Sequence, residues 1–160
     1  MLLDLLRHAD AGDPEAWDRP DAERPLSEKG RKQAKRLGDH LAAIGFRAEA
    51  VITSPKMRAV ETAELVADRV DGTVTEDQRL AGSLDLDIIE AILHDAGDPD
   101  EAMLVGHDPD FSELLSVLCA AAGVTMRKGA LARIEVDRPL RAGGGTLRWL
   151  LPPDLLKPAR

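Results

Sequence analysis

The sequence predicts a mixed α/β fold in which helices cover both faces of a mostly parallel sheet, a three-layer α/β/α sandwich. Two observations predict it. Short apolar runs alternate with longer segments of helical periodicity along the 160 residues. The runs carry apolar side chains on both faces, which is typical of parallel strands covered by helices. The length fits one domain, which we expect to span residues 1–160.

The first elements follow from leucines, caps and turn residues. Residues 2–6 are rich in leucine and predict a short strand buried on both faces. The polar stretch 10–24 contains several Asp and Pro residues and predicts a surface loop that carries function. Ser27 can cap the helix that follows, and Gly45 can end it.

The rest of the chain repeats strand, turn and helix. Residues 50–53 predict a second strand and residues 57–70 a second helix, whereas the segment 76–84 shows no clear pattern. The later expected elements are a strand at 73–75, a helix at 85–96, a strand at 103–105, a helix from Pro109 to about Ala122, and strands at 131–136 and 146–151.

Charge and composition exclude several classes of partner. With 21 Lys and Arg against 29 Asp and Glu, the net charge is −8, which argues against nucleic acid and anionic membranes as partners. The single cysteine, Cys119, excludes an internal disulfide and fits a reducing compartment. The apolar start of the chain, residues 1–6, contains Asp4 and is followed directly by Arg7 and His8, so it is neither a signal peptide nor a membrane span by its pattern. We therefore expect a cytoplasmic protein.

Three predicted strands end in residues suited to phosphate chemistry. Arg7 and His8 follow the first strand, Ser54 and then Arg58 follow the second, and His107 follows the strand at 103–105. Because the carboxyl ends of parallel strands share one edge of the sheet, we expect these side chains to meet there. Two arginines and two histidines form a cationic cluster that suits a small dianion such as a phosphoryl group.

Four ordered blocks of sequence carry a resemblance that covers nearly the whole chain. They are Leu5-Leu6-Arg7-His8-Ala9-Asp10, Arg24-Pro25-Leu26-Ser27 with Gly30, Ser54-Pro55-Lys56-Met57-Arg58-Ala59-Val60-Glu61-Thr62-Ala63, and Leu104-Val105-Gly106-His107-Asp108-Pro109. These blocks resemble the histidine phosphatase superfamily in its phosphoglycerate mutase-like branch, and its small SixA-type phosphohistidine phosphatases most of all. Ala9 stands where the family usually has glycine.

The resemblance implies a phosphoglycerate mutase-like fold and a metal-independent phosphatase without cofactor. His8 would be the nucleophile, and Arg7, Arg58 and His107 would bind the phosphoryl group. To attack phosphorus, a neutral His8 needs one ring nitrogen free, so we expect the other to donate to a backbone carbonyl or a carboxylate. We expect His107 to be protonated when it meets the phosphoryl oxygens.

One departure from the family bears on the substrate. Members that act on phosphate esters usually have a glutamate acid after the second arginine block, but residues 78–83, Gln-Arg-Leu-Ala-Gly-Ser, contain no carboxylate. An imidazole leaving group needs a positioned acid less than an alkoxide does, so we expect the substrate to be a phosphohistidine-bearing protein. We expect the enzyme itself to be a monomer. Substitute acids could come from four residues, Asp10, Asp18, Asp85 and Asp87.

Three other functions fit parts of the pattern. The chain could be a histidine phosphatase for small phosphate esters or a non-catalytic module that binds phosphoproteins. It could also be a metal-dependent phosphohydrolase with His8, Asp10, His107 and Asp108 as ligands, although adjacent arginines would repel a divalent cation. Several other polar residues are expected only to pack or cap, namely Ser54, Thr62, His40, His94 and Cys119.

Overall fold

A six-stranded sheet forms the centre of the computed structural model, which describes residues 1–157. The strands are β1 (Leu2–Arg7), β2 (Ala50–Thr53), β3 (Val74–Glu76), β4 (Glu101–Gly106), β5 (Leu131–Val136) and β6 (Gly145–Leu151). Their order is β3-β2-β4-β1-β5-β6. The neighbours among β1 to β4 pair in parallel, while β5 pairs antiparallel with both β1 and β6. The sheet is therefore mostly parallel, as predicted.

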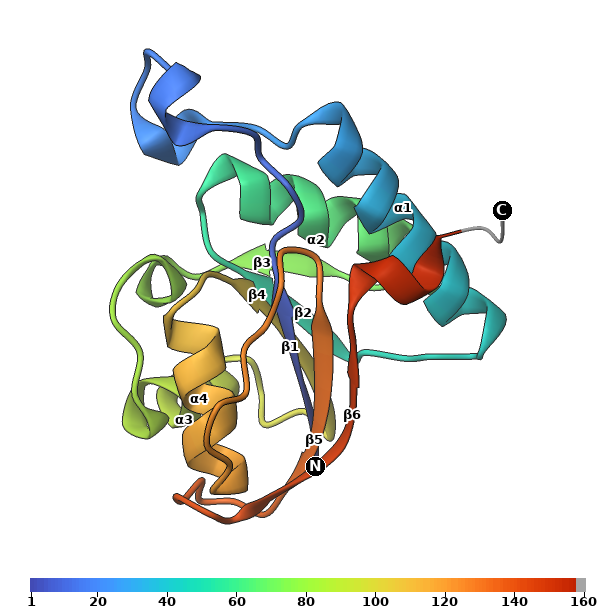
Figure 1. Ribbon diagram of the computed structural model, residues 1–160. Helices are drawn as coiled ribbons and strands as arrows, with labels where there is room; N and C mark the ends of the chain where they lie inside the picture. The colour runs from blue at the N-terminus through green and yellow to red at the C-terminus, as the bar shows by residue number, and fades with distance from the viewer. Residues whose placement is uncertain (158–160) are drawn as a thin grey trace.

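Four helices cover the sheet in two pairs. They are α1 (Glu28–Ala43), α2 (Met57–Val70), α3 (Leu86–Asp95) and α4 (Asp110–Cys119). The helices α1 and α2 lie together on one face, and α3 and α4 lie on the other (Figure 1). Each pair encloses its own apolar cluster against the sheet. This arrangement confirms the three-layer α/β/α fold expected from the sequence.

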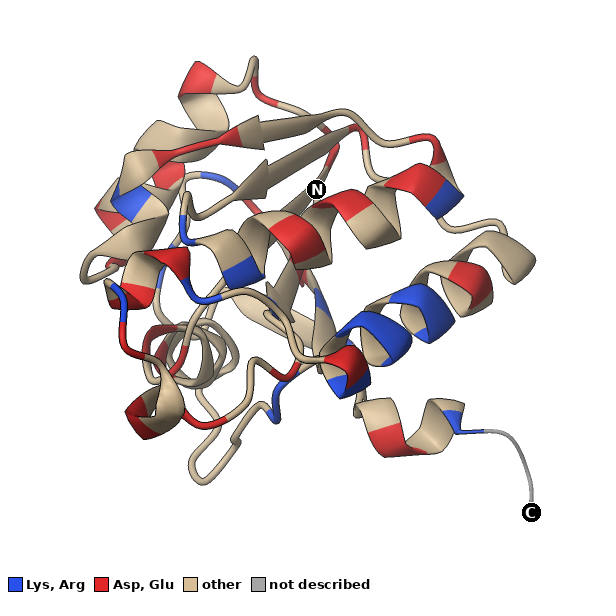
Figure 2. Cartoon of the chain, turned by 90° about the horizontal axis from the view of Figure 1, so that it is seen from above, with Lys and Arg blue, Asp and Glu red and all other residues tan. Residues whose placement is uncertain are grey.

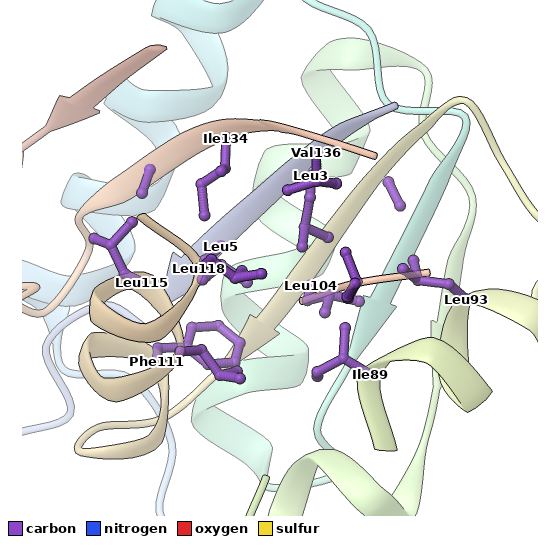
Figure 3. Packing of buried hydrophobic residues seen from close by; sticks show 14 of the residues in the cluster. Leu3, Leu5, Ile89, Leu93, Leu104, Phe111, Leu115, Leu118, Ile134 and Val136 are labelled. Atoms are coloured by element: carbon purple, nitrogen blue, oxygen red, sulfur yellow. The ribbon is translucent and has the colours of Figure 1, made fainter. Parts of the chain in front are cut away.

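Leucines of β1 contribute to both clusters because side chains alternate across a strand. Leu3 and Leu5 pack toward α3 and α4, whereas Leu6 packs toward α1 and α2. Figure 3 shows Leu3 and Leu5 beside Leu104 of β4 and Phe111 of α4. The burial of both faces explains why the first strand is almost continuously apolar.

Caps and tertiary contacts set the helix ends. The Ser27 hydroxyl accepts a hydrogen bond from Gly30 N at 3.0 Å and begins α1, as predicted. The helix expected to reach Ala122 ends earlier, at Cys119, where Ala120 adopts a left-handed φ of 48°. The chain from there returns to β1, where Gly129 N donates to the carbonyl oxygens of Arg7 and His8 at 3.1 and 3.0 Å. This contact beside β1 requires residues 120–130 to leave the helix.

Three stretches outside the four helices hold short 3₁₀ turns. The segment without a clear sequence pattern contains one at Gln78–Ala81, and its Leu80 is buried in the core. The polar loop contains turns at Pro14–Ala16 and Asp21–Glu23, and the last described turn is η4 (Pro153–Leu156). Within residues 1–157, the helices are too short or too polar to cross a bilayer.

Candidate active site

The ends of β2, β4 and β1 meet at one edge because these strands are neighbours in the sheet. His8 N donates to Gly106 O at 2.9 Å, and Ser54 N donates to Val105 O at 2.9 Å. The rings of His8 and His107 lie 5.2 Å apart between centroids. The structure thus brings together the strand-end residues that the sequence singled out.

Glycine makes the close approach at the end of β4 possible. A Cβ on Gly106 would lie 2.7 Å from the ring of Phe111, which is in the first turn of α4. Real Cβ atoms do not approach a buried ring this closely, so a larger residue would push α4 away from the sheet. Gly106 thereby sets where the chain of His107 leaves the strand.

The imidazole of His8 is held in one orientation. Its Nδ1 lies 2.7 Å from the carbonyl oxygen of Ala9, and since a carbonyl can only accept, Nδ1 carries the proton. The lone pair of the neutral ring is then on Nε2. This is the hydrogen bond that the sequence reasoning required of His8.

Burial keeps His8 neutral. It lowers the pKa of His8 to about 4, and although the hydrogen bond to Ala9 opposes this shift, the positive charges of Arg58 and Arg7 add to it. At neutral pH the ring is therefore uncharged. A neutral imidazole with a defined lone pair can act as a nucleophile without first losing a proton.

His107 is the second buried imidazole of the site. Its Nε2 is hydrogen-bonded to the hydroxyl of Ser54 at 2.8 Å. The pKa of His107 is lowered to about 3, mainly by burial and to a smaller extent by the nearby His8 and Arg58. In the protein alone the ring is thus neutral at pH 7, not protonated, because it is desolvated among cations. A dianion placed between these groups would raise the pKa of His107.

The two arginines are held by different parts of the chain. Arg7 Nη1 donates to the carbonyl of Met126 at 2.7 Å and to the Asp108 carboxylate at 3.4 Å. Arg58 is buried, and its Nη1 and Nη2 donate to the backbone oxygen and the carboxylate of Asp21, each at 2.9 Å. Arg58 is therefore not a surface cation of α2; it points into the protein, toward the loop 10–24.

Three buried nitrogens at this edge have no hydrogen-bond partner within residues 1–157. They are Nε of Arg7, Nε of Arg58 and Nδ1 of His107. The two arginine nitrogens carry hydrogens, and nearly all buried donors in proteins are paired, so these unpaired donors indicate a ligand that supplies acceptors. A tetrahedral oxyanion has several acceptor oxygens and the charge that guanidinium groups favour.

Sequence reasoning missed the role of two residues here. Asp21 was one acidic residue among several in the polar loop, and only its contact with Arg58 distinguishes it. Ser54 was expected merely to pack or cap, yet it hydrogen-bonds the His107 ring. Its position directly after a strand at this edge was the one available signal. Thr62 packs, as expected, but caps no helix: it is buried in α2, donates to Arg58 O at 2.7 Å and accepts from Ala9 N at 3.1 Å.

Carboxylates near the edge are poor proton donors. Burial tends to raise the pKa of Asp10, but hydrogen bonds from Ser27 and Gly12 outweigh it and the pKa is lowered. The pKa of Asp21 is likewise lowered, because hydrogen bonds from Arg24 and Arg58 outweigh the effect of burial. Both groups are therefore ionised at neutral pH and have no proton to give.

The three remaining candidate acids, Asp85, Asp18 and Asp87, form no hydrogen bond with the site residues over the described length of the chain. Asp85 caps α3 by accepting from Ile88 N at 2.8 Å. Asp18 and Asp87 are exposed, and in the described chain neither forms a hydrogen bond or ion pair with the two histidines or the two arginines of the site. Within residues 1–157, the structure identifies no carboxyl group suited to protonate a leaving oxygen.

The residues of the metal-dependent alternative are engaged elsewhere. Asp10 accepts from the Ser27 hydroxyl at 2.6 Å, and Asp108 accepts from the Ser112 hydroxyl at 2.7 Å and pairs with Arg7. The described residues contain no group of three or more His, Cys, Asp or Glu side chains placed to hold a metal ion.

Comparisons with known proteins place the fold and the family. Residues 3–83 match the histidine phosphatase superfamily (branch 1). The phosphohistidine phosphatase SixA of Escherichia coli K12 is 27% identical over 100% of this chain and 99% of its own length. An uncharacterised protein of Picosynechococcus is 33% identical over 95% of this chain and all of its own.

A solved structure of a histidine phosphatase has the same fold as this chain. The protein histidine phosphatase SixA complexed with tungstate superposes with a TM-score of 0.84 at 25% identity, over 98% of this chain and 100% of that one. The fold and these matches define a phosphatase of mixed α/β, phosphoglycerate mutase-like architecture. The chain belongs to the histidine phosphatase superfamily, as its four sequence blocks predicted.

Proposed function

We propose that this chain is a phosphohistidine phosphatase that acts on a phosphorylated histidine of another protein through a covalent phospho-His8 intermediate. The observation that carries the proposal is the hydrogen bond from His8 Nδ1 to Ala9 O, which leaves Nε2 with its lone pair among the arginines. The similarity to the phosphohistidine phosphatase of Escherichia coli supports the same substrate class.

The first step transfers the phosphoryl group to the enzyme. His8 Nε2 attacks phosphorus as the bond to the substrate imidazole breaks, and the substrate ring, protonated on its other nitrogen, takes the electron pair and leaves as neutral imidazole. The charge that phosphorylation brings to the His8 ring is shared with Ala9 O through Nδ1–H. Arg7, Arg58 and His107 stabilise the oxygens of the moving phosphoryl group with the nitrogens that are unpaired in the free protein.

The second step releases phosphate. Water attacks phosphorus, the bond to His8 Nε2 breaks, and the proton of the attacking water leaves with solvent or the phosphate. The neutral ring returns to its starting state, because its low pKa disfavours protonation after release. No step requires a metal ion.

The protonation states of the carboxylates near the site favour a phosphoramidate substrate over a phosphate ester. Asp10 and Asp21 have lowered pKa values and are ionised at neutral pH. An alkoxide leaving group gains about 10²–10⁴-fold from a positioned acid, and this site offers it none. A substrate imidazole can already be protonated on its other nitrogen near neutral pH, so it leaves as a neutral ring without such help.

A trapping experiment tests the mechanism. The enzyme is mixed briefly with ³²P-labelled phosphohistidine peptide and quenched, and we expect acid-labile, base-stable label on His8. His8→Ala removes both label and turnover, while His40→Ala, at an exposed position on α1, serves as a matched control that keeps both. Label on another residue, or label that persists in His8→Ala, contradicts the proposal.

Three further measurements separate the alternatives. Equal or faster turnover of simple phosphate esters than of phosphohistidine peptide would favour an ester phosphatase. Loss of activity on chelation would favour the metal-dependent mechanism. Binding of the phosphopeptide without turnover would favour a non-catalytic module.

A further inference from the structure

One surface of this acidic protein is positively charged. Figure 2 shows Lys and Arg concentrated on the outer side of α1, whereas the neighbouring α2 shows mostly Asp and Glu. Two adjoining hollows lie along this side of α1, and both are lined by Lys29 and Gln33. We call their cations the basic stripe: Lys29, Lys32 and Arg36 of α1, Arg127 and Lys128 of the loop before β5, and Lys157 after η4.

The stripe begins at the candidate active site. Arg7, which the mechanism places on the phosphoryl group, lines the same hollow as Lys29, Arg127 and Lys128. The positive charge of Lys128 also contributes to the lowered pKa of His8, so this lysine lies within electrostatic reach of the nucleophile. From Lys29 to Arg36 the stripe extends about 10 Å further along α1, at 1.5 Å per residue.

The cations of the stripe outnumber the carboxylates beside it. The two hollows contain six stripe cations and three carboxylates, Asp10, Glu28 and Asp154. The carboxylates pair with Lys128, Lys32, Arg127 and Lys157. Lys29 and Arg36 have no ion pair within residues 1–157. A net positive surface thus stands in a chain whose net charge is −8.

An ordinary solvated helix face does not account for this arrangement. Such a face mixes charges of both signs along one helix, and its cations gain nothing from residues of other elements. Here three elements that are far apart in sequence, α1, the 120–130 loop and η4, bring their cations to one side of the site. Like charges gathered in this way repel one another unless an anionic partner is bound.

We propose that the basic stripe is the docking surface for an acidic face of the protein that carries the phosphohistidine. This rests on the proposed function, because the stripe would orient a substrate whose phosphoryl group enters beside Arg7. The net charge of −8 repels acidic proteins in general, so a local positive surface restricts productive encounters to one orientation. Nucleic acid would also meet the stripe, but the rest of the surface repels it.

The test uses three substrates that differ in charge and in size. They are a histidine-phosphorylated peptide with glutamates three to six residues from the histidine, the same peptide with glutamines, and potassium phosphoramidate. At about 3.3 Å per residue, the glutamates of an extended peptide reach 10–20 Å from the phosphoryl group, which matches the stripe. We expect kcat/KM for the glutamate peptide to exceed that for the glutamine peptide about tenfold at low salt, and this preference to vanish at high salt.

Two double variants with the same change in charge separate docking from bulk charge. Lys29→Glu/Arg36→Glu alters two stripe residues that lack ion pairs. Arg47→Glu/Arg141→Glu alters two exposed residues that precede β2 and follow β5, at the opposite edge of the sheet. We expect the stripe variant to lose the preference for glutamates and the control variant to keep it, with phosphoramidate turnover unchanged in both.

The outcomes distinguish the two proposals. A preference for glutamates that persists in the stripe variant, or is absent from the wild type, overturns the docking surface and leaves the proposed function standing. No turnover of any of the three substrates overturns the proposed function and the docking proposal with it. Equal circular dichroism spectra and melting temperatures for the two double variants exclude unfolding as the cause of a difference.

Discussion

Gly30 is the position where the structure allows the least change, and Gly30→Ala tests how α1 supports His8. A Cβ on Gly30 would lie 2.8 Å from the carbonyl carbon of Asp10 and 3.0 Å from its nitrogen, and nearer still to its oxygen. The obstacle is backbone, which cannot rotate away as a side chain can. This backbone continues directly from Ala9, whose carbonyl holds the His8 ring.

The size of the effect follows from what must move. Overpacking of this kind costs about 1–3 kcal/mol. Asp10 O also accepts a hydrogen bond from Ser27 N at 2.9 Å, worth about 1 kcal/mol. Alanine returns about 1 kcal/mol through its higher helix propensity than that of glycine. We therefore expect Gly30→Ala to lower the free energy of unfolding by about 1–3 kcal/mol.

Urea unfolding and steady-state kinetics measure the two consequences. Because a shift of about 1 Å in a reacting group can cost about 10²-fold in rate, we also expect a large fall in kcat for phosphoramidate. Gly82→Ala is the matched control: its nearest contact would be 3.7 Å away, and we expect its stability to change by less than about 0.5 kcal/mol. Equal stability of the two variants would refute the reasoning.

Two further substitutions test the ring of His107 and the core. Ser54→Ala removes the hydroxyl that hydrogen-bonds His107. We expect kcat/KM for phosphoramidate to fall about tenfold, which is the equivalent of one hydrogen bond. An unchanged kcat/KM contradicts a positioning role for Ser54. Arg133→Met removes both hydrogen bonds, at 2.9 Å each, from the fully buried carboxylate of Asp4, and urea unfolding at pH 7 should show a loss of about 3–5 kcal/mol. Burial raises the pKa of Asp4 to about 6 even though Arg133 lowers it, so in the variant the carboxyl binds a proton at a higher pH than in the wild type, and the loss should shrink as the pH falls from the alkaline range to about 6. A loss that does not change with pH in this range contradicts the assignment.

Much of the fold was predictable because it depends on local patterns. The alternation of apolar runs with helical periodicity identified the strands and helices that form the three layers. Ser27 as a cap and the bounds of α2, Met57–Val70, also followed from the sequence. The end of α4 did not, since Ala120 leaves the helix to let Gly129 reach β1. No periodicity within the helix records that distant contact.

The candidate site shows the same division. Arg7, His8, Arg58 and His107 were visible because each follows a predicted strand or lies in the first turn after one, and the strand order brings those ends together. The partner of Arg58 was not visible, because Asp21 reaches it from a loop with several similar carboxylates.

The sequence by itself indicated the layers, the family and the two arginines and two histidines at one edge of the sheet, because periodicity and strand ends are properties of short segments. Only the tertiary structure decided that His107 is neutral, that Asp21 holds Arg58, and that cations of three separate elements form the basic stripe. Burial and pairing depend on which distant segments come into contact, and desolvation among neighbouring charges sets the protonation of a ring more strongly than its place in the chain does.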